Sequence, residues 1–200
     1  MNTYTIVPVT GKPQWETVPW LYAENHQWMP EADIRMGSQI CYSEKGLHVH
    51  MRAWEKNIRA EFTEPLDPVC MDSCMEFFFS PLADDLRYFN VEMNPNGCIY
   101  LGFGTGRHDR IRFIYGHGDL LEDKQVNRLE DGWEQFYTFP LSLLQQFFPG
   151  YELTPGRKIP ANCFKCGELT DPVHFITWNK IDTAEPDFHQ RQFFGEMVLG

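Results

Sequence analysis

The chain has 200 residues, a formal net charge of −11, and 42% hydrophobic and 22% charged residues. This composition is typical of one globular domain spanning residues 1–200, and it excludes disordered, collagen-like and coiled-coil chains. Because the excess of carboxylates repels phosphate backbones and anionic lipid headgroups, we expect neither nucleic acid nor a membrane as a partner. Aromatic residues make up 15% of the chain, which suits a β-rich core or a surface that stacks on flat ligands.

The N-terminal sequence, MNTYTIVPVTGKPQW, has no basic start followed by an apolar stretch, so it does not resemble a secretory signal. No segment of the sequence reaches the ~20 apolar residues that a membrane span needs. If Met1 is the natural start, we expect the protein to be cytoplasmic; a trimmed export signal is the alternative.

Alternation of apolar and polar residues predicts short strands along the whole chain. In chain order, these strands span residues 6–9, 34–42, 47–53, 74–80, 88–94, 98–103, 111–115, 133–139, 157–165, 174–178 and 193–199. Only residues 141–148 have helical spacing, with Leu141, Leu144 and Phe148 on one side. The sequence therefore predicts an all-β fold, an antiparallel β-sandwich or jelly roll with one short helix.

The strongest polar face is predicted on two neighbouring strands. Glu76 alternates with apolar residues on the first, and Asn90 and Glu92 share one phase of the second. If these strands form an antiparallel pair around Ala83 or Asp84, Glu76 lies opposite Asn90 or Glu92. Carboxylates and amides then gather on one sheet face, which either binds a ligand or is simply solvated.

The sequence after this pair predicts a hairpin through Asn94-Pro95-Asn96-Gly97. A three-residue turn puts Tyr100, Gly102 and Gly104 on the polar face, and the glycines then leave a groove for a ligand. A two-residue turn puts the same residues on the opposite face.

Residues 102–110, GFGTGRHDR, alternate glycines but continue into a predicted strand. A phosphate-binding loop needs a helix N-terminus after its glycines, so nucleotide binding is not indicated. Arg107 and His108 are instead candidates to donate hydrogen bonds to an oxygen-rich ligand, or to form surface ion pairs.

The C-terminal part of the chain mixes aromatic rings with histidine and arginine, notably at Trp178, Phe188 and His189. Such rings either fill the core or form a stacking platform beside hydrogen-bond donors. Sugar recognition requires the second arrangement, because flat apolar rings pack on C–H surfaces while charged and amide groups bind hydroxyls.

Four cysteines, Cys70, Cys74, Cys163 and Cys166, have C-x₃-C and C-x₂-C spacings that a zinc site can use. However, Cys74 lies in a strongly β-forming stretch, so one of the four is expected to point into the core. We therefore expect neither bound zinc nor a disulfide bond, and all six cysteines act as small hydrophobic residues.

Two other functions stay open from the residues alone. Glu76 and Glu92 could act as the carboxylate pair of a glycoside hydrolase, an enzyme of carbohydrate metabolism, although nothing on an open polar face obviously raises the pKa of either group. The seven histidines leave non-covalent haem binding open, whereas the absence of C-x-x-C-H excludes covalent haem.

Several segments, taken in order, resemble the carbohydrate-binding module family 9-like domains. These segments are residues 69–79, 88–94, 106–110, 163–167 and 178–195, and the resemblance runs from about Ile34 to the end. It implies a β-sandwich of the dopamine-monooxygenase N-terminal-like superfamily. It also implies binding of a sugar or oligosaccharide without catalysis, and structural calcium, for which Asp84-Asp85 is the candidate acidic stretch.

The resemblance further implies roles for single residues. Glu76 corresponds to the sugar-contacting glutamate of the family, while Asn90 stands where well-studied modules have an arginine. Of the family's two clamp tryptophans, one is missing, because Val69 and Cys70 occupy its place, and Phe188 replaces the other.

We therefore predict one sugar site made of a polar sheet face and two rims. Its residues are Glu76, Asn90 and Glu92 on the face, Arg107 and His108 on one rim, and Trp178, Phe188 and His189 on the other. Binding of a mono- or oligosaccharide there would serve carbohydrate catabolism.

Overall fold

A computed structural model describes residues 1–114 and 120–200 of the chain. Its strands are β1 (Thr3–Pro8), β2 (Leu21–Ala23), β3 (Asn25–His26), β4 (Arg35–Ser43), β5 (Gly46–Trp54), β6 (Cys74–Phe79), β7 (Tyr88–Met93), β8 (Ile99–Gly104), β9 (Arg110–Arg112), β10 (Glu122–Leu129), β11 (Gly132–Pro140), β12 (Lys158–Gly167), β13 (His174–Thr177) and β14 (Gly195–Leu199). Its helices are α1 (Leu141–Phe147) and the short 3-10 helices Trp15–Thr17, Val69–Met71 and Arg191–Phe193. No helix in the described part of the chain is long and apolar enough to cross a membrane.

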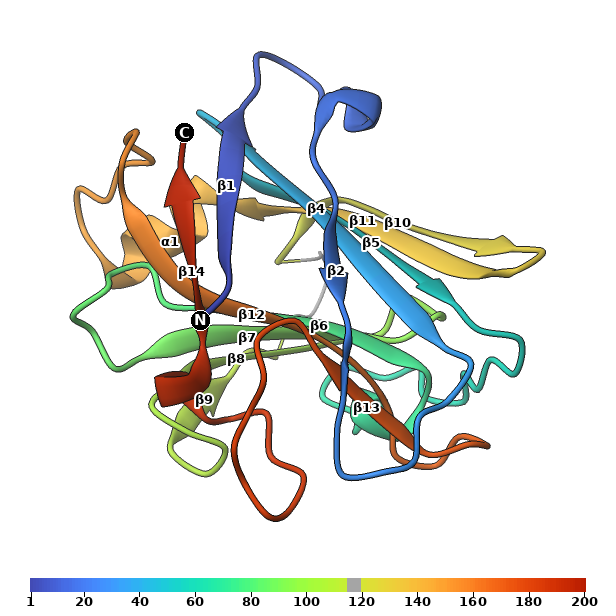
Figure 1. The fold of residues 1–200 in the computed structure, drawn as a ribbon. Coiled ribbons are helices and arrows are strands. Elements are labelled where there is room, and N and C mark those ends of the chain that lie inside the picture. Colours follow the sequence, from blue (N-terminus) through green and yellow to red (C-terminus); the bar gives the residue numbers. More distant parts are fainter. Residues whose placement is uncertain (115–119) are drawn as a thin grey trace.

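The strands form two layers around a hydrophobic core (Figure 1). The first sheet has the order β10-β11-β5-β4, with β2 paired to β4. The second sheet has the order β14-β12-β6-β7-β8-β9, with β13 paired to β12 and β3 paired to β13. Strand β1 joins the two sheets, because its first residues pair with β14 and its last two pair with β4.

The expectation of an antiparallel sandwich is only partly correct. Strand β1 runs parallel to both β4 and β14, so the sheet is mixed. Parallel partners need a long crossover connection, and almost the whole chain lies between β1 and β14. Alternation along a strand indicates which side chains are buried but not the direction of the neighbouring strand, so it does not reveal a parallel pair.

The other predicted strands are found close to their expected positions, and the predicted helix is α1. Of the predicted strand 111–115, the structure has β9, which begins one residue earlier, while residue 115 lies outside the described residues. Strands β2, β3 and β10 were not predicted. The first two are too short to show a period, and β10 is a polar edge strand with every side chain partly or fully exposed.

Aromatic packing in the core positions the strands that carry the site. Phe89 of β7 contacts Phe79, Phe103 and Phe139, with ring centroids 5.5, 4.3 and 4.9 Å apart. Because alternate residues of a strand point to opposite faces, this inward packing leaves the residues between them on the outer face of the second sheet. The predicted polar face is therefore on the side of the sheet that faces away from the sandwich core.

Candidate functional site

Two glutamates lie side by side on the outer face of the second sheet. Strands β6 and β7 pair with Glu76 opposite Glu92, a register centred on Asp84 as expected. The turn after β7 places Tyr100 opposite Glu92, so of the two turn lengths that the sequence left open, the structure has the one that continues this face onto β8. Glu76 is 2% exposed and Glu92 is 6% exposed, so the face is not simply solvated.

A cavity of about 170 Å³ opens onto this pair of glutamates. Segments from distant parts of the chain form its walls: the 3-10 helix before β6, the β8–β9 connection, the residue after β12, and the loop that follows β13. The residues that line it are Cys70, Met71, Glu76, Glu92, Arg107, Arg110, Glu168, Phe188 and His189. The polar face is thus covered by side chains that leave one small opening.

Burial and like charge change the acidity of the two carboxyl groups. Burial raises the pKa of Glu76 well above its ordinary value, and Glu92 raises it further. Burial also raises the pKa of Glu92, while Arg110 opposes this shift with its Nη1 3.4 Å from Glu92 Oε1. Because the two carboxyl groups are buried on directly opposed residues, the negative charge of Glu92 favours the protonated form of Glu76. The expectation that nothing raises either pKa is therefore wrong, because it assumed an open face.

Arg110 of β9 is a central cation of the site. Its guanidinium lies over the Tyr100 ring, 4.7 Å from the ring centroid, and its Nη1 is 3.4 Å from Nε2 of His189. Because a guanidinium only donates, Nε2 accepts, and the Nδ1–H of His189 donates to the Tyr88 hydroxyl over 2.7 Å. Burial and the positive charge of Arg110 lower the pKa of His189 to about 2, so this imidazole is neutral.

The glycines of β8 do not leave an open groove. A Cβ atom on Gly102 would lie 2.5 Å from Oδ1 of Asn90 and 3.0 Å from Cδ of Arg110. At Gly104 it would overlap the backbone of Asp109. The glycines therefore let β9 and its arginine approach the sheet closely, and the predicted groove is filled by the protein itself.

The structure brings five of the eight predicted site residues to the cavity. These five are Glu76, Glu92, Arg107, Phe188 and His189. Asn90 lies beneath them and holds one of the carboxylates, because its Nδ2 donates to Glu92 Oε1 over 2.9 Å.

Two predicted residues lie elsewhere. Trp178 has the same phase as Ile176 of β13, and both side chains pack in the core between the sheets rather than at a rim. His108 is exposed and lines a separate depression beside Phe103 and Phe147. The mixed aromatic and polar composition of these segments does not show which residues point inward, and that is why both were included.

Sequence reasoning did not single out Arg110, Glu168 or Cys70 as site residues. Arg110 lies opposite Gly104 in the register of β8 and β9. A long cationic side chain opposite a glycine on the neighbouring strand was the one feature of the sequence that could have indicated its position. Glu168 and Cys70 meet through the backbone, because the Glu168 N–H donates to the Cys70 carbonyl over 3.0 Å. No local pattern predicts that contact, since the two residues lie almost a hundred positions apart.

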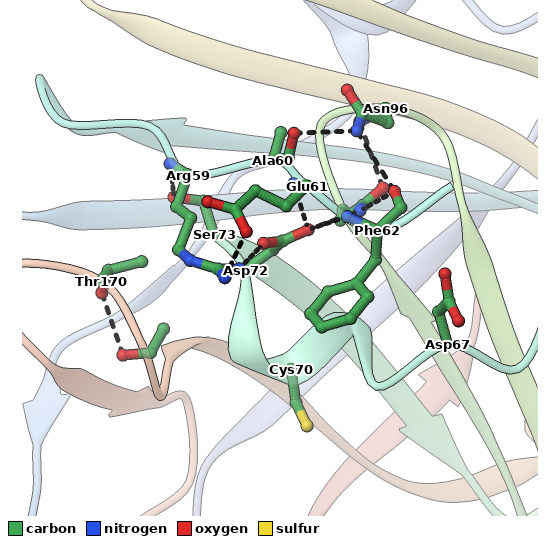
Figure 2. Close-up of polar contacts among 12 residues, drawn as sticks. Arg59, Ala60, Glu61, Phe62, Asp67, Cys70, Asp72, Ser73, Asn96 and Thr170 are labelled. Atoms are coloured by element: carbon green, nitrogen blue, oxygen red, sulfur yellow. Dashed lines mark hydrogen bonds and ion pairs between the residues drawn. The ribbon is translucent and has the colours of Figure 1, made fainter. Parts of the chain in front are cut away.

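The wall around Cys70 is held by the buried carboxylate of Asp72 (Figure 2). Asp72 forms an ion pair with Arg59. Its Oδ2 accepts hydrogen bonds from the backbone N–H groups of Glu61 and Phe62, over 2.9 and 3.0 Å. These contacts connect residues 59–62 to the segment just before β6 and hold the cavity wall in place.

A family model described as carbohydrate-binding family 9 matches residues 7–199. The chain belongs to this family. Its fold is similar to that of a protein from Bacteroides uniformis, provisionally described as carbohydrate-binding, with a TM-score of 0.84, 22% identity and 99% of each chain covered. A comparison with curated proteins finds no match.

Two other similar structures are of a family 9 module from Caldicellulosiruptor kristjanssonii. One is in complex with cellotriose, with a TM-score of 0.69 and 11% identity over 99% of this chain and 93% of that one. The other is in complex with glucose, with a TM-score of 0.70 and 11% identity over 100% of this chain and 96% of that one. At these identities the likeness establishes the shared fold of the family 9 domains.

The acidic stretch that family 9 suggests for calcium does not fit that ion. Asp85 Oδ1 and Oδ2 both accept hydrogen bonds from the Arg87 side chain, over 2.6–3.1 Å. Within residues 1–114 and 120–200, one group of three His, Cys, Asp or Glu side chains has its ligand atoms within 4.8 Å of one another: Cys74, Glu76 and Cys166. Calcium takes about six to eight oxygen ligands, so a set with two thiols does not suit it.

Four histidines that are buried or half-buried give haem binding no support. His48, His50, His174 and His189 each have both ring nitrogens in hydrogen bonds within the protein. A haem iron needs a free ring nitrogen as its axial ligand. These four residues would have to break existing contacts to provide one.

A second surface with aromatic rings lies on the outer face of the first sheet. Trp20 and Tyr22 stack with centroids 5.9 Å apart and planes at 16°, and Trp54 lies 6.1 Å from Trp20. The Arg52 guanidinium covers the Trp54 ring at 4.8 Å. Trp20 is 36% exposed and Tyr22 is 50% exposed, so their rings are accessible. This aromatic surface of Trp20, Tyr22 and Trp54 was not predicted from the sequence.

Proposed function

We propose that this family 9 domain binds a monosaccharide, or the end of an oligosaccharide, in the cavity above Glu76 and Glu92, without catalysis. The observation that carries the proposal is the lining of the cavity, where carboxylates, guanidinium groups and an aromatic ring converge. A carboxylate accepts hydrogen bonds from hydroxyl groups, and a guanidinium donates to sugar oxygens. The lining therefore matches the ring of hydroxyls that a sugar presents.

The size of the cavity supports recognition of a single ring. At about 170 Å³ it is smaller than the roughly 300–1,000 Å³ of pockets for drug-sized ligands. One sugar unit is the ligand that suits such a space, so a chain would enter by its end. The two Caldicellulosiruptor complexes, with glucose and with cellotriose, suggest the probes to use.

Phe188 provides the aromatic contact. Its ring stacks on Phe164 with centroids 4.2 Å apart and planes at 8°, so one face is already covered. Trp28 and Phe175 also pack against this ring, each with its centroid 5.9 Å away, so a sugar can contact the part of the ring that lines the cavity. Because aromatic contacts of this kind contribute about 0.5–1.5 kcal/mol, most of the affinity is expected from the charged groups.

The test is calorimetric titration of glucose and of cellotriose into the wild type and matched variants. Charge-assisted hydrogen bonds contribute about 1.5–3 kcal/mol each. Glu76→Ala and Arg107→Ala should therefore each weaken binding by roughly 10- to 100-fold, since about 1.4 kcal/mol is a factor of ten. Arg112→Ala is the control, because Arg112 is exposed on β9 and does not line the cavity. Unchanged affinity in both cavity variants overturns the proposal.

Two outcomes would point to other functions. Loss of binding in Trp20→Ala, with the cavity variants unaffected, would move the sugar to the aromatic surface of the first sheet. Glycoside hydrolysis is the second candidate, because a raised pKa suits Glu76 to the role of general acid. Release of glucose from cellotriose by the wild type but not by Glu76→Ala would replace the binding-only proposal.

A further inference from the structure

Two thiols and a carboxylate converge beneath the cavity. Cys74 of β6 and Cys166 of β12 are directly opposite each other in the sheet register, and Glu76 follows Cys74 by two residues on the same face. Their ligand atoms all lie within 4.8 Å of one another, and the Cys166 Sγ–H donates to Glu76 Oε1 over 3.1 Å. All three side chains are buried. The cluster therefore already has the shape of a three-ligand site.

This set is not the one suggested by the cysteine spacings. Cys163, the third cysteine of that motif, packs in the core between the sheets, on the opposite side of β12 from Cys166. Glu76 is the third member of the cluster instead, and a search based on cysteine spacing does not find a glutamate. The expectation of no zinc followed from four cysteines that could not all converge, and the observed set does not need Cys163.

The geometry suits a tetrahedral, thiophilic cation. Zinc binds thiolate sulfur at about 2.3 Å and carboxylate oxygen at about 2.0–2.2 Å, so its ligand atoms are roughly 3.5–3.8 Å apart. The contact between Cys166 and Glu76 is already this short, and small side-chain rotations would bring in Cys74. Hard cations such as calcium or magnesium prefer oxygen alone, so the two thiols select against them.

The surroundings provide access and charge balance. Glu76 and Cys70 both line the cavity, so a fourth ligand can reach the cluster through the cavity. Two thiolates and one carboxylate carry three negative charges, so a bound divalent ion leaves one net negative charge at the cluster. Arg107, which lines the same cavity, offsets that remaining charge, while Arg110 stays paired with Glu92.

We propose that Cys74, Cys166 and Glu76 bind one zinc ion, with its fourth position facing the cavity beside Cys70. Binding breaks the two S–H bonds and forms two Zn–S bonds, so at least two protons are released for each ion and no electron is transferred. A purely structural cluster, in which a thiol only satisfies a buried carboxylate, would release none. The proposal goes beyond sugar binding and does not depend on it.

The experiment uses reduced, metal-free protein without sugar. Zinc is titrated in competition with a chromophoric chelator, and cobalt(II) is then used as a spectroscopic probe. We expect one ion per chain, release of at least two protons, and the charge-transfer absorption of cobalt–thiolate bonds. Cys74→Ala and Cys166→Ala should each weaken zinc binding by more than the roughly 10- to 100-fold typical of losing an outer-shell partner.

Cys163→Ala is the matched control, since it removes a buried thiol from the same strand on the opposite face. Equal loss in this control, no thiolate band with cobalt, or no proton release would overturn the proposal. Glu76→Gln serves as a second variant if an alanine variant fails to fold, and it should also weaken zinc binding. Sugar titration into the chelator-treated wild type tests the proposed function separately, so failure of one does not imply failure of the other.

Discussion

Arg110 allows a quantitative test of how the buried face is stabilised. It forms an ion pair with Glu92 in which the two side chains are only 9% and 7% exposed. Removing one partner of a buried pair costs about 3–5 kcal/mol, because the other charge is left unpaired. Glu92 keeps the hydrogen bond from Asn90 and can take up a proton, so we expect about 3 kcal/mol for Arg110→Met. For a chain of this size, that loss lowers the melting temperature by roughly 6–12 °C.

The measurement is urea unfolding at pH 7 of Arg110→Met, Glu92→Gln and the double variant. The double variant should recover part of the loss, with a coupling energy of about 1–3 kcal/mol between the two positions. Arg52→Met provides the comparison, because its partner Asp131 is 57% exposed and a surface pair contributes about 1 kcal/mol or less. Losses at Arg110 and Glu92 that simply add would refute the argument that the buried pair acts as a unit.

Two further predictions concern packing and pH. Gly102→Ala should lower the stability by about 1–3 kcal/mol in thermal unfolding and should also lower the sugar affinity in calorimetry, because the added methyl group would displace Asn90. Gly106→Ala is the control and should change neither quantity, because a Cβ atom there has no neighbour within 4 Å. Burial and Lys165 lower the pKa of His174 to about 4, against about 6.5 in the unfolded chain, so stability is lost as the pH falls from 6.5 towards 4. Between pH 7 and pH 5 the wild type should lose about 2 kcal/mol more than His174→Gln in urea unfolding, and equal losses would contradict this.

The arrangement of Glu76 and Glu92 could be predicted because it depends on local geometry. The side-chain phase of each strand follows from a period of two, and the number of residues between the strands sets the register of a hairpin. Placing Glu76 opposite Asn90 or Glu92, and Tyr100 on the same face for a three-residue turn, therefore needed no knowledge of the rest of the chain. The same reasoning predicted β5, β8 and β11 and which of their side chains point into the core.

The covering of that face could not be predicted in the same way. Arg110 reaches the glutamates only because β9 crosses close to glycines of β8, and His189 arrives on a loop far along the chain. These contacts are long-range, and no period records them. The parallel pairing of β1 was missed for a similar reason, since its partners β4 and β14 are separated from it in sequence by very different distances.

The partners of four buried carboxylates indicate which of these groups is free to bind a ligand. Glu55 pairs with Lys165 at 3.1 Å, Asp72 pairs with Arg59, and Glu92 pairs with Arg110. The pair of Glu55 and Lys165 links distant parts of the chain, whereas Asp72 and Glu92 pair with arginines 13 and 18 positions away. Among the described residues, Glu76 is the buried carboxylate without an ion pair, and its hydrogen-bond donor is the thiol of Cys166. A buried acid that no cation of the fold holds in an ion pair is available to a ligand, whether that ligand supplies hydroxyl groups or a metal ion.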